Sequence, residues 1–214
     1  PRTVPRRTTS RDPGGPRLAT SRSRGPVRVV AEARTPQLLP SGVLGMLIFV
    51  FTELMLFSGL ISAFTIIRSA AVVWPPPGQP RLPFEQTAFN TMLLLASGVM
   101  LLLTRRTFQR DRAKARRPLA IAMGLGAAFV ALQGAEWLAL LRQGLTLTSS
   151  SFGSFFYMII GLHALHVLIA LGILAYAWLR LHRGWLASSQ LATAEVFWYF
   201  VVGIWPVLYL VVYR

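Results

Sequence analysis

Five long apolar stretches constrain the fold of this 214-residue chain more than any other feature of its sequence. They lie at about residues 42–67, 84–104, 119–141, 152–179 and 191–213. Each is close to or above the roughly 20 residues that an α-helix needs to cross a bilayer. One such stretch could be a buried helix of a soluble core, but five in succession indicate a membrane protein. We therefore expect an all-α fold, a polytopic bundle of five transmembrane helices over residues 41–214.

Residues 1–40 differ from the rest of the chain, because they combine nine Arg with many Pro, Ser and Thr. They contain too little apolar surface to offset the entropy of ordering, so we expect a largely disordered basic arm. Its composition is similar to that of a transit peptide, whereas the apolar core of a secretory signal is missing from it. Such an arm could bind anionic lipid headgroups or could only enforce the orientation of the chain.

The charge is strongly unbalanced, with 22 Lys and Arg against 7 Asp and Glu, a formal net charge of +15. Such a balance can indicate nucleic-acid binding, but here the charges lie between apolar runs, so we expect no nucleic-acid partner. Eighteen basic residues fall on one side of the predicted bundle, in the arm and the connections 105–118 and 180–190. The positive-inside rule then predicts a cytoplasmic N-terminus and a periplasmic or external C-terminus.

The sequence contains no Cys, which excludes disulfides, thiolate zinc sites, Cys-ligated clusters and cysteine nucleophiles. It shows no phosphate-binding loop, nucleophile elbow or dinucleotide fingerprint. His163 and His166 lie three apart on one helix and cannot be opposite axial ligands of one haem, and the third histidine, His182, lies in a predicted cytoplasmic connection. We expect no independent catalytic site and no cofactor held by this chain.

Five polar residues are expected at membrane depth, where each needs a partner or a role. Glu53 lies near the middle of the first span, His163 and His166 near the middle of the fourth, and Gln133 and Glu136 on one face of the third. We predict that they form one internal cluster, in which a protonated Glu53 donates to a neutral histidine. Three readings stay open: hydrogen bonds between helices, proton conduction or gating, and an iron or manganese site.

The last span carries three residues that are candidates for contact with lipid or with the membrane interface. Glu195 lies close to its cytoplasmic end, where the side chain can snorkel toward water. Together with Trp198 and Trp205, it is predicted to make interfacial or lipid contacts.

Several motifs occur in a fixed order along the spans. They are the Glu-bearing run 51–59, Asn90-Thr91 with Ser97-Gly98, Gln133-Gly134-Ala135-Glu136, Phe152-Gly153-Ser154-Phe155-Phe156 followed by Gly161-Leu162-His163-Ala164-Leu165-His166-Val167, and the run 195–205 with its Glu-x-x-Trp start. In this order and spacing, the chain resembles the subunit III family of cytochrome c oxidase over about residues 42–213. Tyr199 stands where that family usually has His, and Val202 where it usually has Asp.

The resemblance implies the five-helix bacterial form, an accessory subunit of the cell inner membrane without redox centres. It implies partners: subunit I, which carries haem and copper, and subunit II, with cytochrome c or quinol as electron donor and with bound phospholipid. Its implied role is to support subunit I in O₂ reduction and proton uptake during aerobic respiration. Two alternatives stay open: an accessory subunit of nitric oxide reductase, and a stand-alone proton or small-solute carrier that uses Glu53 with His163 and His166.

Overall fold

The computed structural model describes residues 39–74 and 84–213. The expected disordered arm therefore lies outside the described residues, apart from its last two positions. The connection 75–83, which was expected to be external, and Arg214 also lie outside them.

The described chain forms five α-helices in the predicted order. They are α1 (Ser41–Ala70), α2 (Phe84–Arg110), α3 (Arg116–Arg142), α4 (Ser151–His182) and α5 (Ser188–Tyr213). Each is long and apolar enough to cross a membrane. The prediction of an all-α bundle of five membrane helices is confirmed.

Local chemistry at the helix ends explains where the chain turns. Gly144 and Gly184 follow α3 and α4 with φ angles of 90° and 74°, the left-handed region that favours glycine. The Ser150 hydroxyl accepts a hydrogen bond of 3.1 Å from the Gly153 amide and so caps the start of α4. Between α2 and α3, the Asp111 carboxylate accepts bonds from two amides of the turn, Ala113 at 2.9 Å and Lys114 at 3.3 Å.

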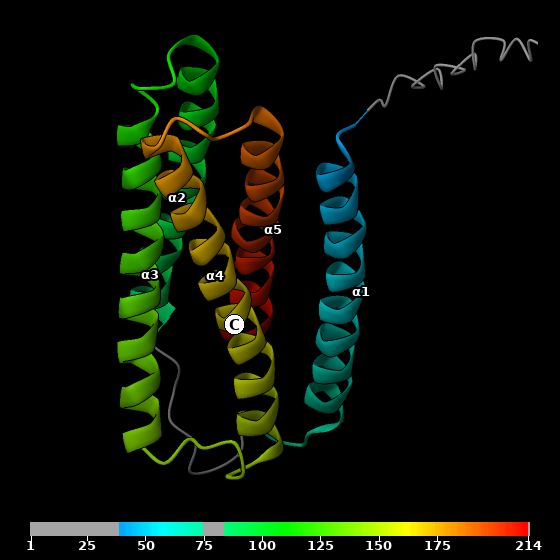
Figure 1. The fold of residues 1–214 in the computed structure, drawn as a ribbon. Coiled ribbons are helices and arrows are strands. Elements are labelled where there is room, and N and C mark those ends of the chain that lie inside the picture. The colour runs from blue at the N-terminus through cyan, green and yellow to red at the C-terminus, as the bar shows by residue number, and fades with distance from the viewer. Residues whose placement is uncertain (1–38, 75–83, 214) are drawn as a thin grey trace, which may run out of the picture. The chain divides into compact units, whose positions relative to one another are not determined.

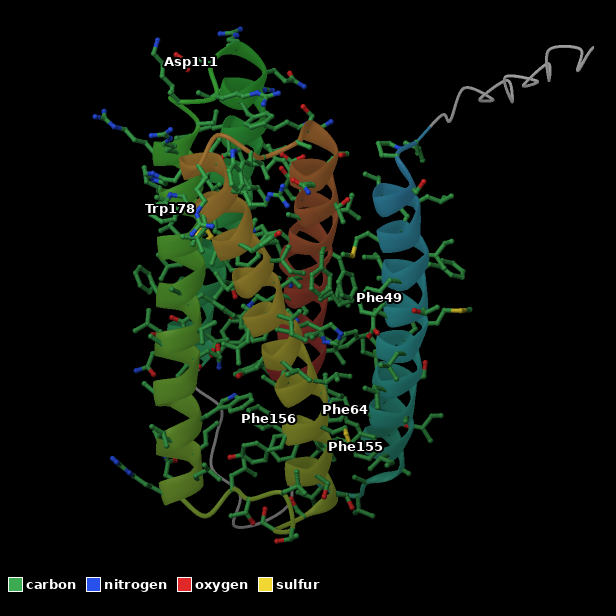
Figure 2. All side chains as sticks on the ribbon, in the orientation of Figure 1. Phe49, Phe64, Asp111, Phe155, Phe156 and Trp178 are labelled. Carbon is green, nitrogen blue, oxygen red and sulfur yellow. The ribbon has the colours of Figure 1, made fainter. Side chains whose placement is uncertain are left out.

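The last helix lies at the centre of the bundle and packs against α1, α2 and α4, while α2 pairs with α3 and α3 with α4 (Figure 1). In the most apolar 18-residue window of α5, 61 % of the residues are buried, against 6 % in α1. The first helix packs only on α5 and α4 among the described elements. Its inner face carries aromatic side chains, including Phe49 and Phe64 (Figure 2), and Phe49 meets Phe197 at 5.7 Å between ring centroids.

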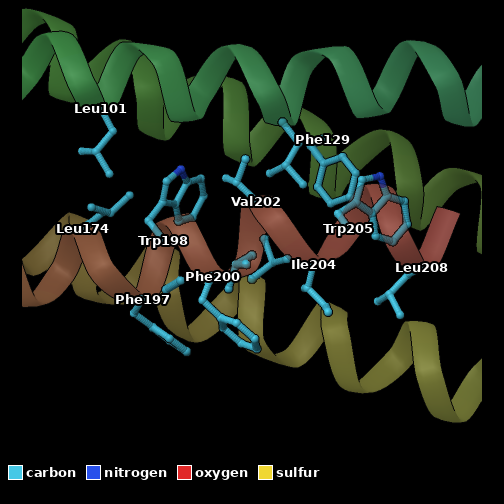
Figure 3. Packing of buried hydrophobic residues seen from close by; sticks show 14 of the residues in the cluster. Leu101, Phe129, Leu174, Phe197, Trp198, Phe200, Val202, Ile204, Trp205 and Leu208 are labelled. Atoms are coloured by element: carbon cyan, nitrogen blue, oxygen red, sulfur yellow. The ribbon is translucent and has the colours of Figure 1, made fainter. Parts of the chain in front are cut away.

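Two tryptophans of α5 organise the core (Figure 3). Both Trp198 and Trp205 are fully buried, and each indole N–H donates to a hydroxyl of α2. The acceptors are Ser97, at 3.2 Å from Trp198, and Thr91, at 2.9 Å from Trp205. A buried indole needs such a partner, so these bonds fix the rotation of α2 against α5.

Candidate functional site

A carboxyl–imidazole pair joins α1 to α4 inside the bundle. Glu53 Oε2 lies 3.1 Å from His166 Nε2, and the other ring nitrogen, Nδ1, lies 2.7 Å from the Leu162 carbonyl oxygen. Since a carbonyl oxygen can only accept, Nδ1 carries a proton and donates it to Leu162. The second nitrogen therefore faces Glu53 either as an acceptor or as a second N–H.

Two arrangements of protons satisfy this geometry. A neutral His166 accepts from a protonated Glu53, or a protonated His166 donates to an ionised Glu53. In both arrangements the pair has no net charge. Aromatic rings surround the imidazole, with Phe57 at 5.6 Å and Phe197 and Phe200 at 6.1 Å between centroids. Such surroundings disfavour separated charges and favour a shared proton.

The second histidine of α4 has different neighbours. The His163 side chain is almost fully buried and stacks on the Trp205 ring, with centroids 4.9 Å apart. Edges of Phe57 and Phe129 meet it from two other helices, at 6.4 and 6.5 Å. Neither ring nitrogen has a hydrogen-bond partner among the described residues. His163 therefore acts here as a packed ring between α1, α3, α4 and α5.

A separate hydrogen-bonded group joins α2, α3 and α5. The Glu136 carboxyl accepts from the Thr87 hydroxyl at 3.0 Å, and from the amides of Asn90 and Gln133, each at 2.9 Å. The same Gln133 nitrogen lies 3.0 Å from the Tyr213 hydroxyl, which extends the group to the end of α5. Three donors on one carboxyl, all from other side chains, satisfy a group that would be costly to bury alone.

This group lies at the wall of a cavity of about 570 Å³ between α2 and α3. Glu85, Gln86, Asn90 and Glu136 provide its polar wall, and Phe89 and Leu132 contribute to its apolar wall. The cavity lies toward the helix ends opposite the Arg-rich connections, where α2 begins and α3 ends. The Glu136 group is therefore reached from that end of the bundle.

An ion pair lies near the other end of the bundle. Arg105 of α2 binds Glu195 of α5 through its Nη1 atom, and the Glu195 side chain is buried. The sequence suggested that this carboxylate can snorkel to water, whereas the structure pairs it with Arg105, which lies 90 positions earlier in the chain. Trp198 and Trp205, also expected at the interface or in lipid, lie inside the bundle because Ser97 and Thr91 supply partners for their N–H groups.

The five residues predicted as one cluster thus divide into the Glu53–His166 contact, the hydrogen-bonded Glu136 group and His163, which forms no hydrogen bond with a described residue. Glu53 meets His166, whereas Gln133 and Glu136 turn toward α2 and the end of α5. Gln133 and His163 border one small cavity of about 160 Å³ between α3 and α4, although no hydrogen bond between them is formed. Sequence reasoning missed Thr87 and Tyr213 as members of the second group, although polar side chains inside an apolar span were the available signal.

The iron or manganese site considered from the sequence needs both carboxylates beside the two histidines. The structure places Glu136 in the α2–α3 group and Glu53 beside His166 alone. Over residues 39–74 and 84–213, no three His, Asp or Glu side chains gather closely enough to hold a metal ion. The contacts that these residues do form are the three hydrogen bonds accepted by Glu136 and the contact between Glu53 and His166.

Comparison with known proteins connects this geometry to a family. A family model described as cytochrome c oxidase subunit III matches residues 33–214. A protein of Thermostichus vulcanus named cytochrome c oxidase subunit 3 is 32 % identical over 176 residues, which cover 80 % of this chain and 86 % of that protein. Proteins of the same name from Synechocystis sp. and Sus scrofa are each 32 % identical over 79 % of this chain, and the matches cover 73 % and 67 % of those proteins.

Proposed function

The chain belongs to the cytochrome c oxidase subunit III family, and from this membership we propose that it is the accessory, non-redox subunit of a bacterial terminal oxidase. In this role it binds beside subunit I, which carries the haem and copper, and subunit II. It supports O₂ reduction and proton uptake by subunit I, with cytochrome c or quinol as the electron donor. The names of its relatives favour an oxidase over the nitric oxide reductase alternative.

The observation that carries this proposal is that the polar side chains in the interior of the bundle contact one another between helices. Glu53 and His166 bind each other across α1 and α4, and Glu136 accepts from donors of α2 and α3. Groups that are occupied in contacts between helices suit a scaffold that holds its shape beside a reacting neighbour. They fit less well with a carrier, which needs polar groups that exchange partners along a path.

We also propose where the subunit lies and how it is oriented. The basic connections between α2 and α3 and between α4 and α5 place their positive charge at one end of the bundle. By the positive-inside rule, this end faces the cytoplasm of a bacterial inner membrane, and the C-terminus faces the periplasm. The outward face of α1, with exposed Leu44, Ile48, Phe51 and Met55, suits contact with phospholipid.

Purification of the tagged full-length chain in mild detergent from its native membrane tests the proposal. We expect two larger subunits to co-purify, and haem and copper to be present in stoichiometric amounts in that complex. The same chain, separated from its partners, should show no stoichiometric haem absorbance. Stoichiometric haem in the separated chain, or a chain that elutes from native membrane without any oxidase subunit, would refute the assignment.

A measurement of O₂ consumption complements the co-purification experiment. Complex from which this subunit has been stripped should lose O₂ consumption during sustained turnover, and adding the purified chain back should restore it. Vesicles that contain the chain alone should show no pH-driven flux. Flux that disappears in Glu53→Gln would instead establish the carrier.

A further inference from the structure

A pocket of about 290 Å³ lies between the last turns of α2 and the first turns of α5. Its walls come from both helices and from the turn after α2, and they combine charged, polar and apolar side chains: Arg105, Phe108, Gln109, Arg112, Ser188, Leu191 and Glu195. Neither the Glu53–His166 contact nor the Glu136 group lines this pocket, which includes the Arg105–Glu195 pair instead. Its position at the ends of two membrane helices places it at the level of lipid headgroups.

The electrostatic surroundings of this pocket are strongly positive. The described basic side chains of the two connections at this end and the adjoining helix turns are Arg105, Arg106, Arg110, Arg112, Lys114, Arg116, Arg117, Arg180 and Arg183. The described acidic side chains of the same segments are Asp111 and Glu195. Glu195 binds Arg105, and Asp111 lies 3.4 Å from Lys114, so both carboxylates are already paired with cations.

The two arginines of the pocket are held in place from behind. Glu195 binds one nitrogen of Arg105, whose side chain remains 50 % exposed. The Arg112 guanidinium lies over the Phe108 ring, 5.1 Å from the centroid, and donates to the Leu186 carbonyl at 3.4 Å. Guanidinium groups fixed in this way lose little side-chain entropy when they bind an anion.

The apolar side chains of the pocket favour an anion that carries an apolar part over a small inorganic anion. Phe108 and Leu191 are buried side chains that form an apolar floor beside the charged groups. A phosphodiester whose glycerol backbone continues into acyl chains can place phosphate on the arginines and carbon on this floor. We infer that this α2–α5 pocket binds the headgroup phosphate of an anionic phospholipid, with Arg105 and Arg112 as its ligands.

This inference rests on the proposal that phospholipid accompanies the subunit and deepens it, since it names a pocket and a headgroup charge. The experiment uses the intact oxidase complex, delipidated in detergent and then exposed to phosphatidylcholine vesicles with or without phosphatidylglycerol. Native mass spectrometry measures how many lipids each complex retains. Inorganic phosphate, added at the lipid concentration, tests whether a free anion occupies the same pocket.

Arg112→Gln removes one pocket cation, and Arg106→Gln is the matched control, since Arg106 is an exposed cation one position beyond Arg105 that does not line the pocket. We expect Arg112→Gln to weaken retention of phosphatidylglycerol about tenfold, the loss of one charge-assisted bond. Arg106→Gln should retain the lipid as the wild type does. Gln109→Glu adds a negative charge to an exposed position of the pocket wall without removing a described hydrogen bond. This variant should also retain less phosphatidylglycerol than the wild type.

Three results would overturn the inference. The first is that Arg106→Gln and Arg112→Gln lose phosphatidylglycerol to the same extent. The others are that the complex retains phosphatidylcholine as well as phosphatidylglycerol, or that inorganic phosphate displaces the bound lipid. The first would mean diffuse attraction to a basic surface, and the last a site for free anions. In each case, co-purification of subunits I and II is recorded separately. An intact complex with unselective lipid retention contradicts only this inference, whereas loss of the partners contradicts the proposed function.

Discussion

Replacing Gly126 by alanine tests the packing at the centre of the bundle. A Cβ atom at this position of α3 would lie 2.5 Å from Cη2 and 2.8 Å from Cζ2 of Trp198, and 3.1 Å from Leu171 Cδ2. Carbon atoms in contact prefer about 3.5–4.0 Å, so one of these groups has to move. The indole cannot move easily, since its N–H is bound to Ser97 and its ring is fully buried.

The magnitude follows from two opposing effects. Inserting a methyl group into a well-packed core costs about 1–3 kcal/mol. Replacing a mid-helix glycine by alanine returns about 0.5–1 kcal/mol through helix propensity. We therefore expect Gly126→Ala to lower the free energy of unfolding by about 1–2 kcal/mol, with any loss above this range indicating that the Trp198–Ser97 bond also breaks.

Gly124→Ala is the matched control, two positions away on the same helix. No heavy atom lies within 4 Å of the Cβ that this substitution adds, so only the propensity gain remains. Unfolding of the full-length chain in mixed detergent micelles, followed by circular dichroism, measures both variants. Equal stabilities for Gly124→Ala and Gly126→Ala would refute the packing argument.

A double substitution separates the clash from a general weakness of α3. A phenylalanine at position 198 lacks the outer indole atoms that the new methyl group would meet. In the Trp198→Phe background, Gly126→Ala should therefore cost less than it does in the wild type, a favourable coupling of about 0.5–2 kcal/mol. A cost that is unchanged in the two backgrounds would place the damage elsewhere.

Other predictions concern polar groups. Glu136→Gln places an amide N–H₂ opposite side chains that already donate, so it should lower the free energy of unfolding by about 1–3 kcal/mol in thermal unfolding. Glu85→Gln, at an exposed position, should leave this free energy unchanged. If Glu53 donates a proton to His166, Glu53→Gln should keep the wild-type stability and Glu53→Leu should lose about 1–3 kcal/mol; equal losses would favour the charged pair. The backbone N–H of Lys114 lowers the pKa of Asp111 below its usual 3.8. The α2–α3 turn should therefore be most protected from amide exchange above this value and lose protection as pH falls through the lowered pKa, a step that Asp111→Asn should abolish.

The positions of the helices could be predicted because hydrophobicity marks the part of a helix that crosses hydrocarbon. The residues at which the helices end could not be predicted in the same way, because these ends are polar. The second span was expected to end near residue 104, but α2 continues to Arg110. Arginine is a good helix former and its long side chain reaches water, so a helix can continue beyond the apolar core.

The pairing of Glu53 with a histidine of α4 could be predicted from the sequence, but the partners of Glu136 could not. Counting along each span placed Glu53 and His166 at similar depth, and the structure joins them. The same cluster was expected to include Gln133 and Glu136, whereas the rotation of α3 turns the Glu136 carboxyl to Asn90. Rotation depends on how neighbouring helices pack, and a single sequence with apolar residues on every face does not reveal it.

The exposed first helix has a consequence for the order in which the bundle assembles. Its main packing partner, α5, follows the other four described helices in the chain and leaves the ribosome after them. Until then, α1 has to remain in the bilayer without its final neighbour, as its apolar outer surface allows. The carboxyl of Glu53 meets His166 only after α4 has been inserted. The full set of contacts of α1 with α4 and α5 can therefore form only after all five described helices have been inserted.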